Sequence, residues 1–353
     1  MSPFRILFSL LAACLLLAAC NRSETPAPPT VTLRGETMGT TYTVKYVSDG
    51  LKQTPAPQEV QKQLDGLLEE VNRQMSTYRE DSEISRFNRM RDTGRPMPVS
   101  ADFGFVTAEA VRLNGLTGGA LDVTVGPLVN LWGFGPDKSV SREPSPEQIA
   151  AASRVTGIDK IALGGTSDAP TLAKAQPEVY LDLSSIAKGY GVDKLALHLE
   201  SLGIGNYLVE IGGELRGKGK NAQGESWRIG IEQPQIVQGG GTQIIVPLDN
   251  RAIATSGDYR NFHTDTHGRR LSHIIDPQRH EPISHNLASV SVIADTAATA
   301  DGLSTALFVL GEERGFALAE KQGLAVFFIV REGGGYRTQT SSALKKMLAQ
   351  EQP

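Results

Sequence analysis

Apolar residues recur along the chain with two different periods, which predicts both strands and helices. Over 40–47, in TTYTVKYV, apolar and polar residues alternate as they do in a half-buried strand. Over 60–75 the apolar residues fall on one face of a helix. A Ser-Pro-Glu-Gln run beginning at Ser145 has the proline and the glutamine of a capped helix start, so we expect another helix there.

The second half of the chain has short apolar runs that are separated by glycine and proline. Without a regular strand-helix-strand period, this pattern predicts an α+β domain with mixed sheets and interleaved helices, in one or two lobes. We predict strands over 178–183, 206–219, 226–234, 243–249, 251–257 and 287–294, a helix over 184–203 closed by Gly203, and a strand, a glycine turn and a terminal helix over 323–348.

The segment 298–311, ATADGLSTALFVLG, is predicted to be a partly buried helix that ends at Gly311. Its apolar face consists of Leu303, Ala306, Leu307 and Leu310. The same helix carries Asp301, Ser304 and Thr305, and the spacing of four places Asp301 and Thr305 side by side. A carboxylate and hydroxyls on one turn are the oxygen ligands that magnesium prefers. The alternative is a buried Asp that caps a loop, with Ser and Thr bonded to helix carbonyls.

The N-terminus has the pattern of a bacterial lipoprotein signal. Arg5 precedes an apolar run that ends in Leu-Ala-Ala-Cys at Cys20, too short for a spanning helix. We expect a signal peptide over 1–19, a lipid on Cys20 and a Pro-rich tether over 20–32. The domain would then cover 33–350. The protein would be anchored to the cell envelope and face the periplasm.

Two alternatives remain for this segment. Cleavage before Cys14, which also ends a Leu-Ala-Ala-Cys run, would leave an apolar stretch on the mature protein. An ordinary secretory signal with incidental cysteines is the other reading. Asn21 is not Asp, which favours the outer over the inner membrane where the bacterial sorting rule applies. Because both cysteines of the chain lie here, the mature domain has no disulfide and no catalytic thiol.

Composition and charge narrow the class of protein. The 353 residues are 40% hydrophobic and 21% charged, as in a globular protein, and the net charge of −4 argues against a nucleic-acid binder. The sequence has no Walker lysine loop, no G-x-G-x-x-G after a first strand, no HExxH and no G-x-S-x-G.

His263 and His267 are four residues apart, but the Gly, Pro and Asp around them argue against a helical zinc site.

A second stretch, LDLSSIAKGYGVD, suggests a phosphate site. A predicted strand ends at Asp182, Ser184 and Ser185 follow at the expected N-cap, and Lys188 falls in the first helical turn. A lysine there opposes the helix dipole unless an anion binds, whereas the N-terminus itself attracts phosphate. The alternative is a lysine that extends to solvent. Two further stretches, GALDVTVGPLVNLWGFGP and those around Met38 and Tyr78, could supply the walls of a site for a flat ligand.

Taken together, these stretches resemble the ApbE family of flavin transferases. The resemblance runs from about residue 33 to the last predicted strand. It rests on eight motifs in order: GTTYTV, MSTYREDSEISRFN, GALDVTVGPLVNLWGFGP, LDLSSIAKGYGVD, VEIGGELRGKG, IATSGDYRNF, HIIDP and ADGLSTALFVLG.

The resemblance implies an ApbE-like, T-fold-related catalytic domain that is an FAD:protein FMN transferase. Such enzymes bind FAD with Mg²⁺, transfer FMN to a threonine hydroxyl of a partner protein and release AMP. The partners implied are subunits of the sodium-translocating quinone reductase or of Rnf complexes. The matched positions imply FAD contacts at Met38, Tyr78, Ala120, Leu121, Asp122, Asp182, Lys188 and Ile275, a metal site at Ser185, Asp301, Ser304 and Thr305 with the Ala187 carbonyl, and catalytic roles for His273 and Asp301.

Some features are left open by the residues or depart from the family pattern. The general base could be His273, Asp182 or a group of the acceptor. The same site could serve a metal-dependent FAD pyrophosphatase, or the protein could be a non-catalytic flavin-binding lipoprotein. Gly302 stands where many relatives have Ala, at a helix cost of about 1 kcal/mol. After Asp276-Pro277 the chain has QRHEP where the family often has a Thr-Gly turn.

Overall fold

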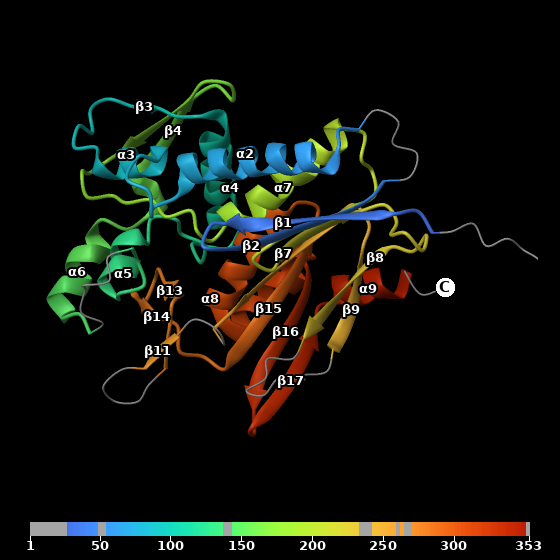
Figure 1. Ribbon diagram of the computed structural model, residues 1–353. Helices are drawn as coiled ribbons and strands as arrows, with labels where there is room; N and C mark the ends of the chain where they lie inside the picture. Colours follow the sequence, from blue (N-terminus) through green and yellow to red (C-terminus); the bar gives the residue numbers. More distant parts are fainter. Residues whose placement is uncertain are drawn as a thin grey trace, which may run out of the picture.

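The computed structural model describes residues 27–48, 54–136, 143–232, 242–258, 262–264 and 270–350. Its centre is an eight-stranded sheet whose neighbouring strands are antiparallel (Figure 1). The sheet confirms the predicted α+β class. In spatial order its strands are β1 (Thr30–Thr37), β2 (Thr40–Val47), β6 (Tyr207–Ile211), β7 (Glu214–Lys218), β10 (Arg251–Gly257), β15 (Leu287–Ala294), β16 (Ala325–Glu332) and β17 (Gly335–Thr340).

Both faces of this sheet are covered. On β16, Val326 and Phe328 pack into the core beneath the long helices, whereas Phe327 and Ile329 pack on the opposite side. A strand that is buried on both faces reads as a continuous apolar run, which explains AVFFIV. One face is covered by the helices α2 (Pro57–Met75), α7 (Ala187–Ser201) and α8 (Ala297–Gln322), and the other by the hairpin of β8 (Trp227–Glu232) and β9 (Thr242–Leu248) and by α9 (Ser342–Gln350).

A smaller group of elements lies beside the helical layer (Figure 1). It contains a three-stranded sheet in the order β3-β5-β4. Its members are α3 (Glu83–Arg89), β3 (Met97–Pro98), α4 (Ala101–Leu116), α5 (Gly126–Leu131), α6 (Pro146–Arg154), the 3-10 turn Ile158–Lys160, β4 (Ile161–Gly165) and β5 (Pro170–Lys174). The short hairpins are β11 (Phe262–Thr264) with β12 (Arg270–Ser272) and β13 (Ile275–Asp276) with β14 (Glu281–Pro282). Ser145 and Gln148 form the predicted capping box of α6.

The helices α7 and α8 pack very closely at their N-terminal ends. A Cβ at Gly189 would lie 2.2 Å from the carbonyl oxygen of Ala297, so only glycine fits at this crossing. The Asp193 carboxylate accepts hydrogen bonds from the backbone N–H groups of Ala297 and Ala298, at 3.0 and 2.9 Å. A side chain of one helix therefore caps the start of the other, and the two helices are held in fixed register.

Two predictions around Asp182 are wrong. The segment 178–183 is not a strand, and α7 begins at Ala187 after Ile186 rather than at Ser184 or Ser185. Residues 178–183 belong to no strand, and backbone groups of Val179 and Leu181 bond to side chains instead. Asn88 exchanges two hydrogen bonds with the backbone of Leu181, at 2.8 and 2.9 Å. The ammonium of Lys174 donates to the carbonyls of Asn88, Pro177 and Val179.

The predicted helix over 298–310 is confirmed, and its end is more complex than expected. Gly311 has φ 75° and breaks the helical backbone, as predicted, but a second helical stretch continues to Gln322. At the C-terminal end, the glycine turn is followed by β17, a strand that the sequence did not reveal, before α9.

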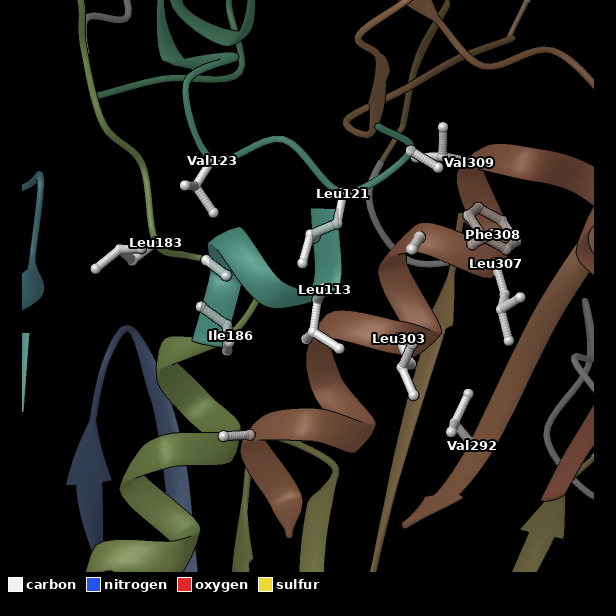
Figure 2. Packing of buried hydrophobic residues seen from close by; sticks show 14 of the residues in the cluster. Leu113, Leu121, Val123, Leu183, Ile186, Val292, Leu303, Leu307, Phe308 and Val309 are labelled. Carbon is white, nitrogen blue, oxygen red and sulfur yellow. The ribbon is translucent and has the colours of Figure 1, made fainter. Parts of the chain in front are cut away.

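The core beneath α8 explains the glycine at 302. Figure 2 shows Leu303 and Leu307 of α8 beside Val292 of β15, with Leu113 and Ile186 packed nearby. A Cβ at Gly302 would lie 2.5 Å from Leu113 Cδ1. Glycine lowers the helix propensity at this position. This loss is offset because a residue without a Cβ lets α8 and α4 pack this closely.

The lipid-anchor predictions for Cys20, Cys14 and the tether lie largely outside the described residues, and so does the zinc candidate His267. Within the described ranges, no helix combines the length and the apolar character that crossing a membrane requires.

Candidate functional site

A cavity of about 530 Å³ opens where α7 and α8 meet the central sheet. It is assembled from segments that are far apart in sequence. These are the turn before α5, the turn 182–185, the β6–β7 hairpin, β8, β10, the segment 273–277 and α8. A cavity of this size suits a cofactor-sized ligand.

A cluster of three charged side chains lies in the wall of this cavity. The Lys188 Nζ atom is 3.3 Å from Glu214 Oε1 and 3.5 Å from Asp301 Oδ1. The other oxygen of Asp301 accepts a hydrogen bond from the Gly189 N–H at 2.9 Å. The two carboxylates are almost fully buried, with side-chain exposures of 5% for Glu214 and 3% for Asp301.

Burial and mutual interaction shift the protonation equilibria of this cluster. Burial raises the pKa of Glu214 to about 8, although Lys188 lowers it. Burial also raises the pKa of Asp301, against the lowering by Lys188 and the Gly189 N–H. Burial opposes the charge of Lys188, but Asp301 and Glu214 outweigh it and raise the pKa of the ammonium. Two carboxylates facing one ammonium thus leave an excess of negative charge when both are ionised.

The hydroxyls predicted to bind metal do not all face the cavity. Thr305 and Ser185 line it together with Asp301. Ser304 is fully buried behind them, and its Oγ lies 2.7 Å from Ser256 Oγ and donates to the Asp301 carbonyl at 2.9 Å. Ser256 is itself in the cavity wall and lies 3.3 Å from Thr305 Oγ1. Ser304 therefore supports this wall through Ser256.

The turn before α7 is shaped by Asp182. Its Oδ1 atom accepts hydrogen bonds from the N–H and the hydroxyl of Ser184, at 2.9 and 2.5 Å. The Asp182 N–H in turn donates to the carbonyl of Val123 at 2.8 Å. This bond joins the turn to the stretch after Ala120, so two of the sequence motifs meet at one wall of the cavity.

The wall around Ala120–Asp122 has an aromatic side chain at its rim. Tyr78 is 64% exposed although it lines the cavity. Asp122 is turned into its own loop, where its Oδ1 accepts from the N–H and the hydroxyl of Thr124, at 2.8 and 2.5 Å. Burial raises the pKa of Asp122 despite these bonds.

A neighbouring part of the wall comes from the segment 273–277, which includes His273 and Ile275. The β13–β14 hairpin is anchored to the stretch 118–132 by two hydrogen bonds. The Trp132 indole donates to the His280 carbonyl at 3.2 Å, and the Gln278 amide donates to the Gly118 carbonyl at 3.0 Å. His280 has φ 61°, a conformation that normally favours glycine, in the loop where the sequence departs from the family pattern.

Most of the residues predicted to contact FAD or the metal converge on this cavity, and three do not line it. Met38 packs against the core near Gly191, Ser304 is behind the wall, and Ala187 is outside the lining as well. The residues that line it are Tyr78, Ala120, Leu121, Asp122, Asp182, Ser185, Lys188, His273, Ile275, Asp301 and Thr305. Their roles toward FAD, metal and catalysis stay predictions.

Glu214 is the main residue that the sequence interpretation missed. The motif VEIGGELRGKG by itself indicates no role for its second glutamate, Glu214. A signal was available, because a Gly-Gly turn pairs Glu214 directly with Ile211 across the hairpin. Residues opposite each other on paired strands point to the same face. The buried Ile211 therefore implies an inward-pointing carboxylate.

A metal at this site would depend on mixed oxygen ligands. Among the described residues, no group of three or more His, Cys, Asp or Glu side chains is placed to hold a metal ion. One carboxylate from Asp301 with the hydroxyls of Thr305 and Ser185 is a donor set that suits a hard cation, which binds few protein carboxylates and completes its shell with water or phosphate. The residues present fit magnesium in that sense.

Comparison with known proteins identifies relatives of this chain by both its fold and its sequence. The chain superposes on the apo crystal structure of the flavinyl transferase ApbE from Pseudomonas stutzeri with a TM-score of 0.82 and 44% identity, covering 90% of this chain and 96% of that one. The family model described as "ApbE family" matches residues 38–328. The chain belongs to the ApbE family.

Two further relatives extend the ApbE match over nearly the whole chain. The flavin transferase ApbE structure from Vibrio cholerae has a TM-score of 0.81 and 48% identity, covering 90% of this chain and 99% of that one. The Haemophilus influenzae protein named FAD:protein FMN transferase is 51% identical over 336 residues, which is 95% of each chain. These relatives are named as transferases, and the ApbE resemblance inferred from the motifs is confirmed.

Proposed function

We propose that this protein transfers the FMN part of FAD to a threonine hydroxyl of a partner protein and releases AMP. The observation that carries the proposal is the ammonium of Lys188 beside the buried Asp301 carboxylate in the wall of a cofactor-sized cavity. This arrangement occurs in a chain that is 51% identical to a protein named FAD:protein FMN transferase.

The reaction is a displacement at phosphorus. The threonine oxygen attacks the phosphorus of the FMN half and forms a new P–O bond. The bond between that phosphorus and the bridging oxygen breaks, and AMP leaves with the bridging oxygen. The proton of the hydroxyl passes to a base, for which His273 and Asp182 of the cavity wall are the candidates. The protein's main tasks are to align the hydroxyl and to neutralise phosphate charge.

Lys188 serves the second of these tasks. Its ammonium is kept charged by two neighbouring carboxylates and lies close to the start of α7, whose N–H groups also favour anions. A pyrophosphate bound at this end of α7 would contact both the Lys188 ammonium and these N–H groups. The Ala120–Asp122 wall and Tyr78 would contact the flatter parts of FAD, and Ile275 would add an apolar contact from the segment 273–277.

Magnesium would be held by Asp301 and Thr305, with Ser185 on the neighbouring turn. When bound, it would supply positive charge to the phosphate oxygens. Ser304 would support this group from behind through Ser256. The Asp301 carboxylate is shared with Lys188 and the Gly189 N–H, so its orientation is fixed before any cation arrives.

The acceptor and the location of the protein belong to the same proposal. We propose subunits of the sodium-translocating quinone reductase or of Rnf complexes as acceptors, and a periplasm-facing protein anchored by a lipid on Cys20. In the producing cell, Cys20→Ala should move the protein from the membrane to the soluble fraction, whereas Cys14→Ala should leave it on the membrane. The reverse pattern would place the cleavage site at Cys14.

The transfer reaction is tested with the full-length protein in detergent, FAD, MgCl₂ and an acceptor that carries the target threonine. Flavin fluorescence on the denatured acceptor in a gel is the expected result. Free FMN and AMP without a labelled acceptor would instead identify an FAD pyrophosphatase. Tight FAD binding with neither product would identify a flavin-binding lipoprotein.

A further inference from the structure

Glu214 is a buried carboxylate for which the proposed chemistry has no task. It is the first residue of β7, directly after the Gly212-Gly213 turn, and it lines the cavity. One of its oxygens is 3.3 Å from the Lys188 ammonium, and its other oxygen, Oε2, is buried without a hydrogen-bond partner among the described residues. A buried acceptor left unpaired is costly and calls for an explanation, such as a functional role or a bound ion.

The Lys188 ammonium is held loosely between two carboxylates. Its distances of 3.3 Å to Glu214 and 3.5 Å to Asp301 both exceed the roughly 2.8 Å of a tight charge-assisted hydrogen bond. The ammonium is shared between the two carboxylates, and neither forms a tight ion pair with it. A lysine stem has four flexible carbons, so a short movement of the head group toward either partner is inexpensive.

Asp301 cannot serve Lys188 and a cation equally well. One of its oxygens is used by the Gly189 N–H, and the other faces Lys188. A cation that binds the second oxygen would therefore lie next to the positive ammonium of Lys188 and be repelled by it. The ammonium must leave Asp301, yet it must stay in the cavity if it is to contact phosphate.

We propose that Glu214 is a positioning residue that takes over the Lys188 ammonium when a cation binds Asp301, through the oxygen that is otherwise unpaired. Glu214 thus keeps the lysine beside the pyrophosphate and away from the metal. This inference rests on the proposed roles of Lys188 and Asp301. It assigns Glu214 no contact with the reacting atoms.

Whether removal of the Glu214 carboxylate strengthens or weakens FAD binding distinguishes a positioning role from a purely Coulombic effect of its charge. FAD carries a negative pyrophosphate, so removal of a neighbouring carboxylate should strengthen its binding on Coulombic grounds. If Glu214 positions Lys188, its removal should weaken FAD binding, because the lysine then returns to Asp301 and competes with the cation there.

The test measures FAD binding by fluorescence quenching in full-length protein with saturating Mg²⁺. Glu214→Gln should weaken FAD binding about tenfold, the usual scale for a residue that supports a metal or phosphate contact from behind. Riboflavin, which has no phosphate, should bind equally to both proteins. Calorimetric titration with Mg²⁺ alone should show weaker binding to the variant.

Two controls keep the role distinct from a structural one. Glu232→Gln removes an exposed carboxylate from the same cavity wall and should leave FAD binding no weaker. In a Lys188→Met background, the further change Glu214→Gln should have no added effect, because Glu214 acts only through Lys188. Melting of Glu214→Gln in EDTA should not fall, since Lys188 and Asp301 remain as a matched pair.

Stronger or unchanged FAD binding in Glu214→Gln would overturn the inference. A full effect in the Lys188→Met background, or a melting temperature that falls in parallel with FAD affinity, would also overturn it. Failure of the wild-type protein to bind FAD or to label an acceptor would defeat the proposed function instead, so the two failures are distinguishable.

Discussion

Lys188 lies at the second residue of α7, where a positive charge opposes the helix dipole. The sequence suggested that a bound phosphate compensates this charge, but the fold itself places two carboxylates beside it, Glu214 from β7 and Asp301 from α8. No local pattern around Lys188 indicates these partners, because both come from distant elements. The residue type could be recognised from the sequence, but the electrostatic balance around it depends on tertiary contacts.

Asp301→Asn should remove metal binding with little loss of stability. The amide oxygen of Asn can still accept the Gly189 N–H bond, but it carries no charge to hold magnesium. We expect FMN transfer to fall on the order of 100-fold or more, the scale for loss of a preorganised electrostatic contact. A magnesium series in the transfer assay measures this effect, and excess magnesium should restore activity only in part.

The control for Asp301→Asn is thermal unfolding in EDTA, where neither protein holds a metal. Similar melting temperatures are expected. A strongly lowered melting temperature, or undiminished transfer by the variant, would show that Asp301 is a structural residue and not a metal ligand.

Glu214 should make the metal-free protein less stable at alkaline pH. Its pKa is raised from 4.5 to about 8 in the folded state, so the folded protein holds the proton longer than the unfolded chain does. The stabilisation from this proton is complete below the unfolded pKa and is lost as pH rises through 8. Between pH 6 and 9 the loss should be on the order of 2 kcal/mol. Urea unfolding in EDTA measures it.

Glu214→Gln is the matched variant for this pH series, because its amide does not titrate. Its free energy of unfolding should depend less on pH than that of the wild type over the same range. Equal slopes in the two proteins would mean that Glu214 is already ionised in the folded protein at neutral pH.

At the scale of elements, the sequence predicted those whose hydrogen bonds are local or follow a regular period. The helix α2 and the capped start of α6 are examples. The predicted strand over 178–183 failed because alternation in EVYLDL reports only which side chains are buried. Backbone groups of Leu181 and Val179 bond to the side chains of Asn88 and Lys174, which come from α3 and β5. Such pairing has no signature within the segment itself.

The α7–α8 crossing should not tolerate a methyl group. Gly189→Ala would place a Cβ 2.2 Å from the Ala297 carbonyl oxygen, which is backbone and cannot turn away. The helices must move apart, and the Gly189 N–H bond to Asp301 stretches with them. We expect a loss of about 1–3 kcal/mol in the free energy of unfolding, measured by urea denaturation.

Gly66→Ala is the matched control for this substitution. Gly66 is an exposed residue within α2, and no atom lies within 4 Å of an added Cβ. Alanine should there stabilise the helix by about 1 kcal/mol. The same chemical change should therefore have opposite signs in the two helices. A neutral Gly189→Ala would show that the α7–α8 contact is more adaptable than the structure indicates.

At the scale of the whole molecule, the site is a meeting point of motifs that are spread over some two hundred residues of sequence. Residue types and spacing suggested a phosphate near Lys188 and a cation near Asp301, and only the ordered motifs of the ApbE family joined them into one flavin site. The cavity confirms that the motifs converge. Glu214, the Ser256 support and the Lys188–Asp301 contact required the fold, because each joins elements that are neighbours in space alone.

The central claim is tested most directly by the intact mass of the acceptor. Full-length protein, FAD, Mg²⁺ and the acceptor are incubated, and AMP is measured in the same sample. The account predicts an acceptor heavier by one FMN less one water and an equal amount of AMP. With Asp301→Asn both products should form on the order of 100-fold more slowly, and an acceptor whose threonine is replaced by valine should stay unmodified. An unmodified acceptor in the presence of released AMP and free FMN, or a modified acceptor that forms at an undiminished rate with Asp301→Asn, would contradict it.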